Sequence, residues 1–256
     1  MNIQQYKMSG RPICLRVTRA CNAKCSFCLA PPDNLLIPVD QIFARLTAIR
    51  KLGFRNVDLC GGEPTIRNDL NQIIDKCIEL KMIPSITTNG IHIPDSLLVS
   101  LAKTKIVKVS IHGGKDAHDK IVGVPGSWLK LSANIDKMLK AGINICVQTV
   151  VHADCSNDLD DVVKFCLEKG ITLLRLAPFV PRGEGKNVKE QMTLSAEERK
   201  ALITRSRESI EKEKLNTRWL NFSSPMFVIE TSGDLMLEGA DEENDICIGN
   251  ILDLVK

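Results

Sequence analysis

Segments typical of β-strands and of α-helices alternate along most of the chain, and this alternation limits the fold more than any other feature. The repeat is about thirty residues long, as expected for successive βα units. In such folds, ligand-binding groups follow the carboxyl ends of the strands. The expected strands are 12–18, 56–59, 83–88, 105–111, 144–152 and 171–177. The alternation therefore predicts a parallel sheet with functional residues along one edge.

Length and charge narrow the class of protein. The 256 residues are enough for one large α/β domain with a small appendage. The net charge of +3 comes from 34 basic and 31 acidic residues, so no overall field favours binding to nucleic acid. The first 20 residues contain no apolar signal-like stretch, and no apolar run is long enough to span a membrane. We therefore expect a cytoplasmic protein without nucleic-acid or membrane partners.

Three cysteines directly after the first strand form the most specific motif. Cys21, Cys25 and Cys28 occur in the sequence CNAKCSFC, with the spacing C-x-x-x-C-x-x-C. Thiolates are soft ligands that select iron–sulfur clusters or zinc. Structural zinc sites usually have four protein ligands, and no His or second C-x-x-C follows at a suitable distance. An iron–sulfur cluster is the favoured interpretation, with zinc and three ordinary buried thiols as the alternatives.

A second motif joins the first in pointing to a known family. CNAKCSFC, with Phe27 before its last thiol, resembles the cluster loop of radical S-adenosylmethionine (radical SAM) enzymes. Downstream, GGEP at Gly61–Pro64 resembles the family element that binds the amino group of the SAM methionine. The resemblance covers about residues 12–180 and implies a partial (β/α)6 TIM-type barrel. We expect this α/β barrel in residues 1–190, with the cluster loop at 19–37.

The resemblance also implies cofactors and their contacts. One [4Fe–4S] cluster would be held by the three thiols, and SAM would bind its open iron. Cleavage of SAM with an electron from a flavodoxin- or ferredoxin-type reductant yields a 5′-deoxyadenosyl radical that abstracts a substrate hydrogen atom. The implied SAM contacts are Phe27, Gly61, Gly62, Glu63, Thr88, Asn89, Ser110 and Gln148. For Ser110 and Gln148 the alternative is a hydrogen bond to a backbone group, and for Phe27 it is packing within the cluster loop.

The last part of the chain, 191–256, is expected to form a small α/β extension, a helix plus a β-hairpin packed on the barrel. A capping box formed by Ser195 and Glu198 opens the helix, and a turn at 232–234 joins two strand-like segments. Residues 228–251 resemble the C-terminal extensions called SPASM and twitch, which in many relatives carry cysteines for auxiliary clusters. Here only Cys247 remains near the GN dipeptide, and one thiol cannot hold a cluster.

A single cluster favours a redox-neutral reaction, namely rearrangement, cyclisation or epimerisation, in a biosynthetic pathway. A small-molecule substrate is preferred because no N-terminal domain for grasping a leader peptide is evident. The alternative within the family is a peptide maturase. The alternative of another class is a zinc or iron–sulfur module without radical chemistry.

Two arginines are candidate substrate contacts. Arg16 and Arg175 lie within otherwise apolar strands, where a charged side chain is costly unless it is paired or meets a ligand. Each is expected to contact the substrate or to pair with a carboxylate such as Glu63 or Asp58.

Two further residues follow strand ends and are candidate catalytic groups. His112 is expected to face the substrate or to cap the Gly-Gly turn after it. Cys155 is expected either to return a hydrogen atom to a carbon radical or to be a simple loop thiol. The proline- and glycine-punctuated segment 178–187 is expected to be a mobile cover over the site.

Overall fold

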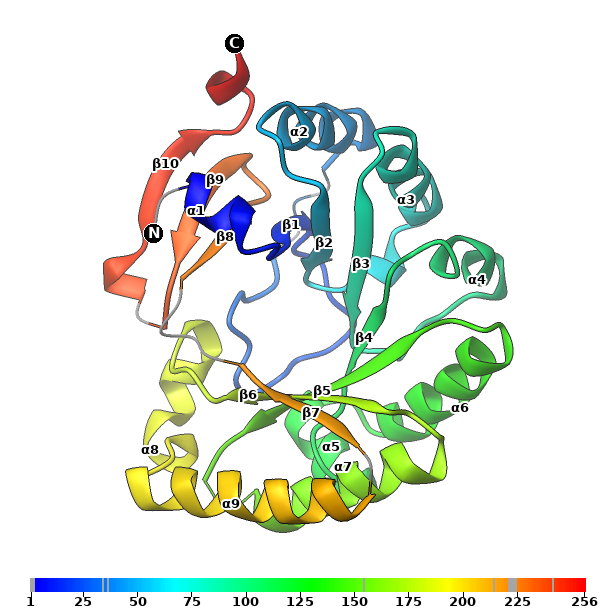
Figure 1. Ribbon diagram of the computed structural model, residues 1–256, viewed down its shortest axis with the longest axis vertical. Coiled ribbons are helices and arrows are strands. Elements are labelled where there is room, and N and C mark those ends of the chain that lie inside the picture. The colour runs from blue at the N-terminus through cyan, green and yellow to red at the C-terminus, as the bar shows by residue number, and fades with distance from the viewer. Residues whose placement is uncertain are drawn as a thin grey trace.

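The computed structural model describes residues 3–33, 35, 37–153, 155–213, 215–220, 225–240 and 242–256. Within these residues ten strands form one sheet, in the order β10-β9-β8-β1-β2-β3-β4-β5-β6-β7 (Figure 1). The strands are β1 (Ile13–Thr18), β2 (Asn56–Gly61), β3 (Ile83–Thr88), β4 (Val107–Ser110), β5 (Ile145–Val151), β6 (Leu173–Pro178), β7 (Asn216–Trp219), β8 (Met226–Ile229), β9 (Asp234–Glu238) and β10 (Ile246–Asn250).

The strands from β1 to β7 all pair in parallel with their neighbours, as the βα repeat predicts. The sheet curves, with helices on its outer side and the segment between β1 and α2 across its inner side (Figure 1). This confirms the predicted α/β fold of the partial TIM-barrel type. The helices that connect these strands are α2 (Val39–Lys51), α3 (Leu70–Glu79), α4 (Asp95–Leu101), α5 (Lys115–Val122), α6 (Ser127–Lys140) and α7 (Ser156–Glu168).

Side chains alternate between the two faces of the sheet, and this alternation separates an apolar core from a polar face. In β1, Ile13, Leu15 and Val17 are fully buried in the apolar core that the sheet shares with the helices. Cys14 and Arg16 alternate with them and therefore face the opposite side. We call this opposite side the inner face of the sheet.

The inner face carries an ion pair in which both charged side chains are buried. Lys108 of β4 pairs with Asp58 of β2, and the hydroxyl of Thr87 donates to the same carboxylate at 3.2 Å. Only 5% of Lys108 and 6% of Asp58 are exposed. The two charges compensate each other, so the pair is tolerated between strands whose other faces are apolar.

The C-terminal part continues the same sheet beyond β1. β8 pairs in parallel with β1, and β9 and β10 add antiparallel strands. Gly233, at a φ of +97°, makes the turn between β8 and β9, where the sequence predicts one. The predicted helix is α9 (Ala196–Glu213), and its capping box forms as expected, with the Ser195 hydroxyl accepting from the Glu198 N–H at 3.1 Å. The division into two domains at residue 190 stays a prediction.

Two helical segments lie where the sequence analysis expects none. The short helix α1 (Ile3–Met8) places the fully buried Tyr6 against Phe227 of β8, with ring centroids 4.9 Å apart. The segment after β6 forms a 3-10 helix, η2 (Gly183–Val188), followed by α8 (Lys189–Met192). In the part of the chain that the structure describes, no helix is long and apolar enough to cross a membrane.

Candidate active site at the carboxyl ends of the strands

The three thiols lie in the loop directly after β1 and are neighbours. Cys21, Cys25 and Cys28 are each partly buried. Burial, followed by the nearby Cys28 and Cys21 thiols, raises the pKa of Cys25 to about 12. Burial likewise raises the pKa of Cys21 and of Cys28. A positively charged metal centre would favour the thiolate forms, so these thiols suit metal binding better than free reactivity.

The donor set fits an iron–sulfur cluster better than a single ion. Among the described residues, no three His, Cys, Asp or Glu side chains converge closely enough to hold one metal ion. In a cluster, each thiolate binds a different iron atom, so such convergence is not required. Backbone hydrogen bonds join the thiol loop to the end of α5. The N–H of Lys24, in the loop, donates to the carbonyl of Val122, the last residue of α5, at 2.9 Å.

The GGE sequence after β2 docks against the segment that leads into the thiol loop. The N–H of Gly62 donates to the Thr18 carbonyl at 2.7 Å, and that of Glu63 to the Ala20 carbonyl at 2.8 Å. A Cβ atom on Gly61 would overlap the Thr18 carbonyl oxygen, and one on Gly62 would overlap that of Ala20. Gly61 also has a φ of +136°. Glycine is therefore required at both positions for this close approach.

Glu63 joins the ends of β2 and β3. Its side chain is fully buried and accepts from the Thr65 N–H at 3.0 Å, the Thr65 hydroxyl at 2.7 Å, the Thr88 hydroxyl at 2.7 Å and the Asn89 N–H at 2.6 Å. Burial raises the pKa of Glu63, and these hydrogen bonds oppose that rise. Of the four bonds, only the one from Asn89 reaches Oε2, so this oxygen keeps capacity for another donor.

Asn89 links the end of β3 to the thiol loop. Its amide nitrogen donates to the side-chain oxygen of Asn22 at 2.7 Å and lies 3.9 Å from the Cys21 sulfur. The structure thus brings the predicted residues of the first three strand ends together around the thiol loop. The residues in this group are Cys21, Gly61, Gly62, Glu63, Thr88 and Asn89.

A row of polar side chains crosses the inner face on the other half of the sheet. Ser110, Gln148, Arg175 and Arg218 are in register on β4, β5, β6 and β7. Ser110, Gln148 and Arg175 are partly exposed, and Arg218 is exposed. Within the described residues, the Arg175 guanidinium has no ion-pair partner. The sequence analysis did not name Arg218. Its position between Thr217 and Trp219 in a strand-like segment is the signal that could have placed it on the opposite face of the strand from them.

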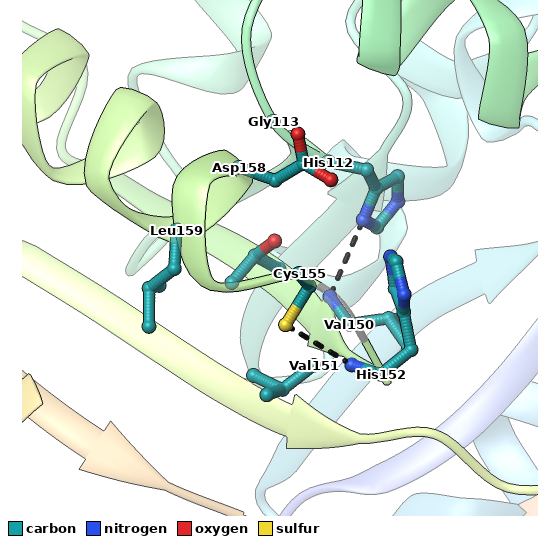
Figure 2. A pocket seen from close by; sticks show the side chains of 9 residues that line it. His112, Gly113, Val150, Val151, His152, Cys155, Asp158 and Leu159 are labelled. Carbon is teal, nitrogen blue, oxygen red and sulfur yellow. Dashed lines mark hydrogen bonds between the residues drawn. The ribbon is translucent and has the colours of Figure 1, made fainter. Parts of the chain in front are cut away.

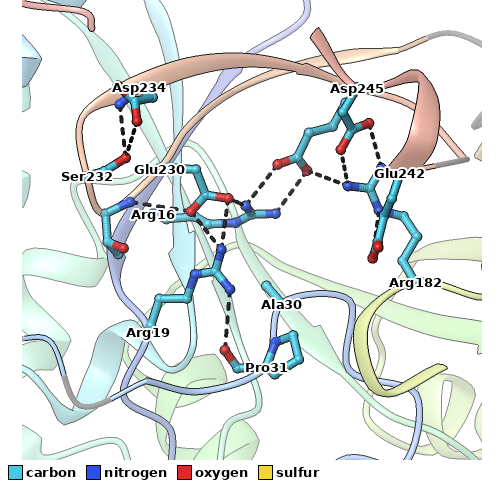
Figure 3. Close-up of polar contacts among 12 residues, drawn as sticks. Arg16, Arg19, Ala30, Pro31, Arg182, Glu230, Ser232, Asp234, Glu242 and Asp245 are labelled. Atoms are coloured by element: carbon cyan, nitrogen blue, oxygen red, sulfur yellow. Dashed lines mark hydrogen bonds and ion pairs between the residues drawn. The ribbon is translucent and has the colours of Figure 1, made fainter. Parts of the chain in front are cut away.

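Arg16 binds carboxylates of the C-terminal part (Figure 3). Its guanidinium donates to both carboxylate oxygens of Glu238 at 2.9 Å and pairs with Glu230 as well. The prediction that Arg16 pairs with Glu63 or Asp58 is therefore wrong, because Glu63 accepts from the end of β3 and Asp58 pairs with Lys108. The substrate contact proposed for Arg16 stays untested, and its two carboxylate partners favour a structural role.

The expected mobile cover is tied down on two sides. The Arg182 guanidinium, 8% exposed, donates to Asp245 at 2.5 and 3.0 Å and to the Gly239 carbonyl at 2.6 Å (Figure 3). On the other side, the N–H of Glu184 donates to the Cys28 carbonyl at 2.9 Å. The segment with η2 therefore joins the thiol loop to the C-terminal strands.

We expect that replacing Arg16 by Met will lower the free energy of unfolding of the apo-protein by about 1.5–3 kcal/mol, because Glu238 would lose its two-oxygen partner and Glu230 would keep only Arg19. Urea unfolding measures this loss. As a control, Lys103→Met removes a pair with Asp75 in which the side chains are 44% and 52% exposed, and should cost at most about 1 kcal/mol. Equal losses in the two variants would contradict the structural role of Arg16.

His112 packs the thiol loop against the outer side of β5. Its ring lies edge-on to Phe27, with centroids 4.9 Å apart, and its Nδ1 accepts from the Val150 N–H at 3.2 Å. Only 6% of His112 and 7% of Phe27 are exposed. These contacts favour a packing role for both residues, and their proposed roles towards substrate and SAM stay untested.

Cys155 lines a small pocket with His112, Thr149, Val151 and Asp158, between β5 and α7 (Figure 2). The thiol is 3% exposed, and its sulfur accepts from the His152 N–H at 3.3 Å. It belongs to the apolar core on the helix side of the sheet. Its predicted hydrogen-donor role is untested, and this position faces away from the inner face. Asp154, beside it, lies outside the described residues.

The neutral state of His112 should make stability depend on pH. Burial, then the charges of His118 and His152, lower its pKa from 6.5 to about 3. As pH falls below 6.5 the unfolded chain binds a proton that the folded chain does not, so the folded state loses stability. Between pH 7 and 5.5 we expect His112 to account for a loss of about 1 kcal/mol, measured by urea unfolding, which His112→Gln lacks. The buried His118, whose pKa is lowered to about 4, adds a loss that remains in this variant. The exposed His92 provides the control, and His92→Gln should keep the dependence.

Comparisons with known proteins agree with this architecture. The model of the radical SAM superfamily matches residues 15–166, which is more than half of the chain. A probable GTP 3′,8-cyclase of Sulfurisphaera tokodaii is 33% identical over 198 residues, covering 73% of this chain and 62% of that protein. An AdoMet-dependent heme synthase of Oleidesulfovibrio alaskensis is 26% identical over 209 residues, covering 77% of this chain and 54% of that protein.

Solved structures share the fold. Streptococcus suis SuiB bound to S-adenosylmethionine has a TM-score of 0.75 at 19% identity, over 95% of this chain and 64% of that one. The structure described as native anSMEcpe with bound AdoMet has a TM-score of 0.75 at 18% identity, over 94% of this chain and 78% of that one.

Fold and site together combine an α/β sheet with three thiols in the loop after its first strand. The chain belongs to the radical SAM superfamily. Its cofactors are those of the family, S-adenosylmethionine and an iron–sulfur cluster, as predicted. The chain spans 62% of the first of the two relatives described and 54% of the second.

Proposed function

We propose that this protein cleaves S-adenosylmethionine reductively at a single [4Fe–4S] cluster and uses the resulting 5′-deoxyadenosyl radical to abstract a hydrogen atom from its substrate. Cys21, Cys25 and Cys28 would hold the cluster. The cluster would supply the electron that breaks the carbon–sulfur bond of SAM. The electron would come from a flavodoxin- or ferredoxin-type carrier, and the proposed location is the cytoplasm.

The observation that carries this proposal is the docking of the GGE sequence on the segment before Cys21. Backbone bonds from Gly62 and Glu63 hold the end of β2 against residues 18–20. Asn89, at the end of β3, reaches Asn22 and Cys21. A molecule bound to a metal at the thiols would therefore lie next to the GGE sequence and the polar end of β3, which the buried Glu63 side chain holds together.

A redox-neutral reaction on a small molecule is the reaction we favour. Cys247 is exposed on β10, and one thiol cannot hold a cluster alone, so a single cluster is proposed. The curated relatives named above are a cyclase and a heme synthase, both of which act on small molecules by their names. The alternative is a peptide maturase, supported by the fold shared with SuiB, which has also been solved bound to its precursor peptide SuiA.

The polar row on the inner face is the proposed place for SAM and substrate. Ser110 and Gln148 would contact SAM, and Arg175, which has no ion-pair partner among the described residues, would contact the substrate. A guanidinium at that position suits a carboxylate or phosphate group.

Anaerobic reconstitution with iron and sulfide, followed by dithionite and SAM, tests the proposed function. We expect about four irons per chain and release of 5′-deoxyadenosine and methionine. One bound zinc per chain without SAM cleavage would instead support a metal-binding module without radical chemistry.

We expect the Ala variants of Ser110 and Gln148 to keep the full iron content but to bind or cleave SAM less well. Both side chains lie in the polar row on β4 and β5 and not in the thiol loop, so their loss should spare the cluster. Loss of one hydrogen bond to a bound ligand costs about 0.5–1.5 kcal/mol, which is a several-fold weaker affinity. Iron analysis and SAM titration measure the two effects. Loss of iron with unchanged SAM binding would contradict this placement.

A further inference from the structure

Two thiols on the neighbouring strands β1 and β2, outside the thiol loop, face the inner side of the sheet. Cys14 lies on β1 between the fully buried Ile13 and Leu15, and Cys60 follows the fully buried Leu59 on β2. Because strand side chains alternate, both thiols face away from the helices. In the register of the two strands, Cys14 lies opposite Asp58 and Cys60 lies opposite Arg16.

The two thiols form a pair. The nearby Cys14 thiol, followed by burial, raises the pKa of Cys60. The Cys60 sulfur therefore keeps its proton at neutral pH, and the S–H group is the form that can give up a hydrogen atom. The pair is built into neighbouring strands of the sheet, so its geometry does not depend on a loop.

Cys60 is the better placed of the two to meet a radical. It immediately precedes Gly61, Gly62 and Glu63, at the end of β2 that docks on the segment before the thiol loop. Cys60 as a residue is partly exposed, and because its side chain alternates with those of Val57 and Leu59, its thiol lies on the inner face. Cys14 is 9% exposed and Cys146, a third inner-face thiol on β5, is 2% exposed.

We propose that Cys60 donates the hydrogen atom of its S–H group to a carbon radical formed at the inner face. This inference rests on the proposed function. A C–H bond forms, the S–H bond of Cys60 breaks, and Cys60 is left as a thiyl radical. One electron from the flavodoxin- or ferredoxin-type carrier and one proton from solvent restore the thiol. The substrate class is one whose product gains a solvent-derived hydrogen on carbon, as in an epimerisation.

Cys60 replaces Cys155 as the donor for a geometric reason. Cys155 is 3% exposed and belongs to the apolar core between β5 and α7. Cys60 is on the same face as Ser110 and Gln148, where we propose that SAM lies.

Isotope labelling without substrate tests the proposal. The reconstituted enzyme is reduced with dithionite and given SAM in D2O, where thiols carry deuterium. We expect wild-type enzyme to form 5′-deoxyadenosine of which a large fraction carries one deuterium at the 5′ carbon. The labelled fraction should fall several-fold in Cys60→Ala and in Cys60→Ser, because an O–H bond is too strong to replace the S–H bond. Cys77→Ala, a core thiol variant, and Cys155→Ala should keep the label.

The outcomes separate this inference from the proposed function. If wild-type enzyme forms no 5′-deoxyadenosine, the proposed function fails and the inference fails with it. If 5′-deoxyadenosine forms with an equal labelled fraction in wild type and Cys60→Ala, the inference alone is overturned. Loss of label in Cys155→Ala but not in Cys60→Ala would restore the donor role to Cys155.

A second measurement does not depend on turnover. In the reconstituted enzyme without reductant, alkylation of each cysteine by N-ethylmaleimide is followed by peptide mass spectrometry. Cys60 should be alkylated several-fold more slowly when SAM is present, whereas the exposed Cys247 should react at the same rate. An unchanged rate at Cys60 would overturn its placement beside SAM.

Discussion

Cys25→Ala is expected to leave a folded protein with little iron and no release of 5′-deoxyadenosine. Cys25 has the pKa most strongly raised of the three loop thiols, to about 12, because it is buried and lies near Cys21 and Cys28. Its thiolate is therefore the one that depends most on a bound metal. With three thiolates, one iron of the cluster lacks a protein ligand. With two thiolates, a second iron also lacks one, and we expect the cluster to be lost. Iron analysis and product quantification after anaerobic reconstitution measure both losses, and Cys21→Ala and Cys28→Ala should behave alike.

Cys77→Ala is the matched control for these variants. Cys77 is a fully buried thiol on α3 in the apolar core, so its replacement should cost about 0.5–3 kcal/mol of stability without loss of iron. Full iron content and full product yield in any one of the three loop variants would exclude that thiol as a ligand.

Gly62→Ala is expected to have the second largest effect. The added Cβ atom would overlap the carbonyl oxygen of Ala20, and the strand end cannot move away without losing the bond from the Gly62 N–H to Thr18. Overpacking of this kind typically costs about 1–3 kcal/mol. Because the displaced backbone leads into the thiol loop, we expect reduced stability and at least a large loss of SAM cleavage. Urea unfolding and the 5′-deoxyadenosine assay measure the two effects.

Gly239→Ala provides the control for this steric argument. No heavy atom lies within 4 Å of a Cβ atom built on Gly239, so its replacement should change stability and SAM cleavage little. Equal behaviour of the two variants would show that the GGE sequence does not depend on the close approach described above.

Local features of the fold and site could be predicted from the sequence because they rest on spacing within one segment. The strand at 83–88 and the capping box of Ser195 and Glu198 occur as expected, since each depends on residues a few positions apart. The thiol loop and the GGE sequence were recognisable for the same reason. Their approach to each other follows from the pairing of consecutive parallel strands.

Contacts between distant segments could not be predicted. Arg16 pairs with Glu230, 214 positions away, because β8 adds to the sheet beside β1, and no local pattern fixes that neighbour. The pairing of Cys14 with Cys60 depends on the register of β1 and β2, which a sequence does not give. Cys155 follows the end of β5, as predicted. Its side chain is in the apolar core because of the direction in which the chain turns after β5, which the sequence does not indicate.

The most direct test of the account is electron paramagnetic resonance of the reconstituted, dithionite-reduced protein before and after addition of SAM. Three thiol ligands would leave one iron of a [4Fe–4S] cluster without a protein ligand. We therefore expect a signal from a reduced [4Fe–4S] cluster that changes when SAM binds, and that is lost in Cys25→Ala. A signal that SAM leaves unchanged, or a protein that holds one zinc ion and gives no signal, would contradict the account.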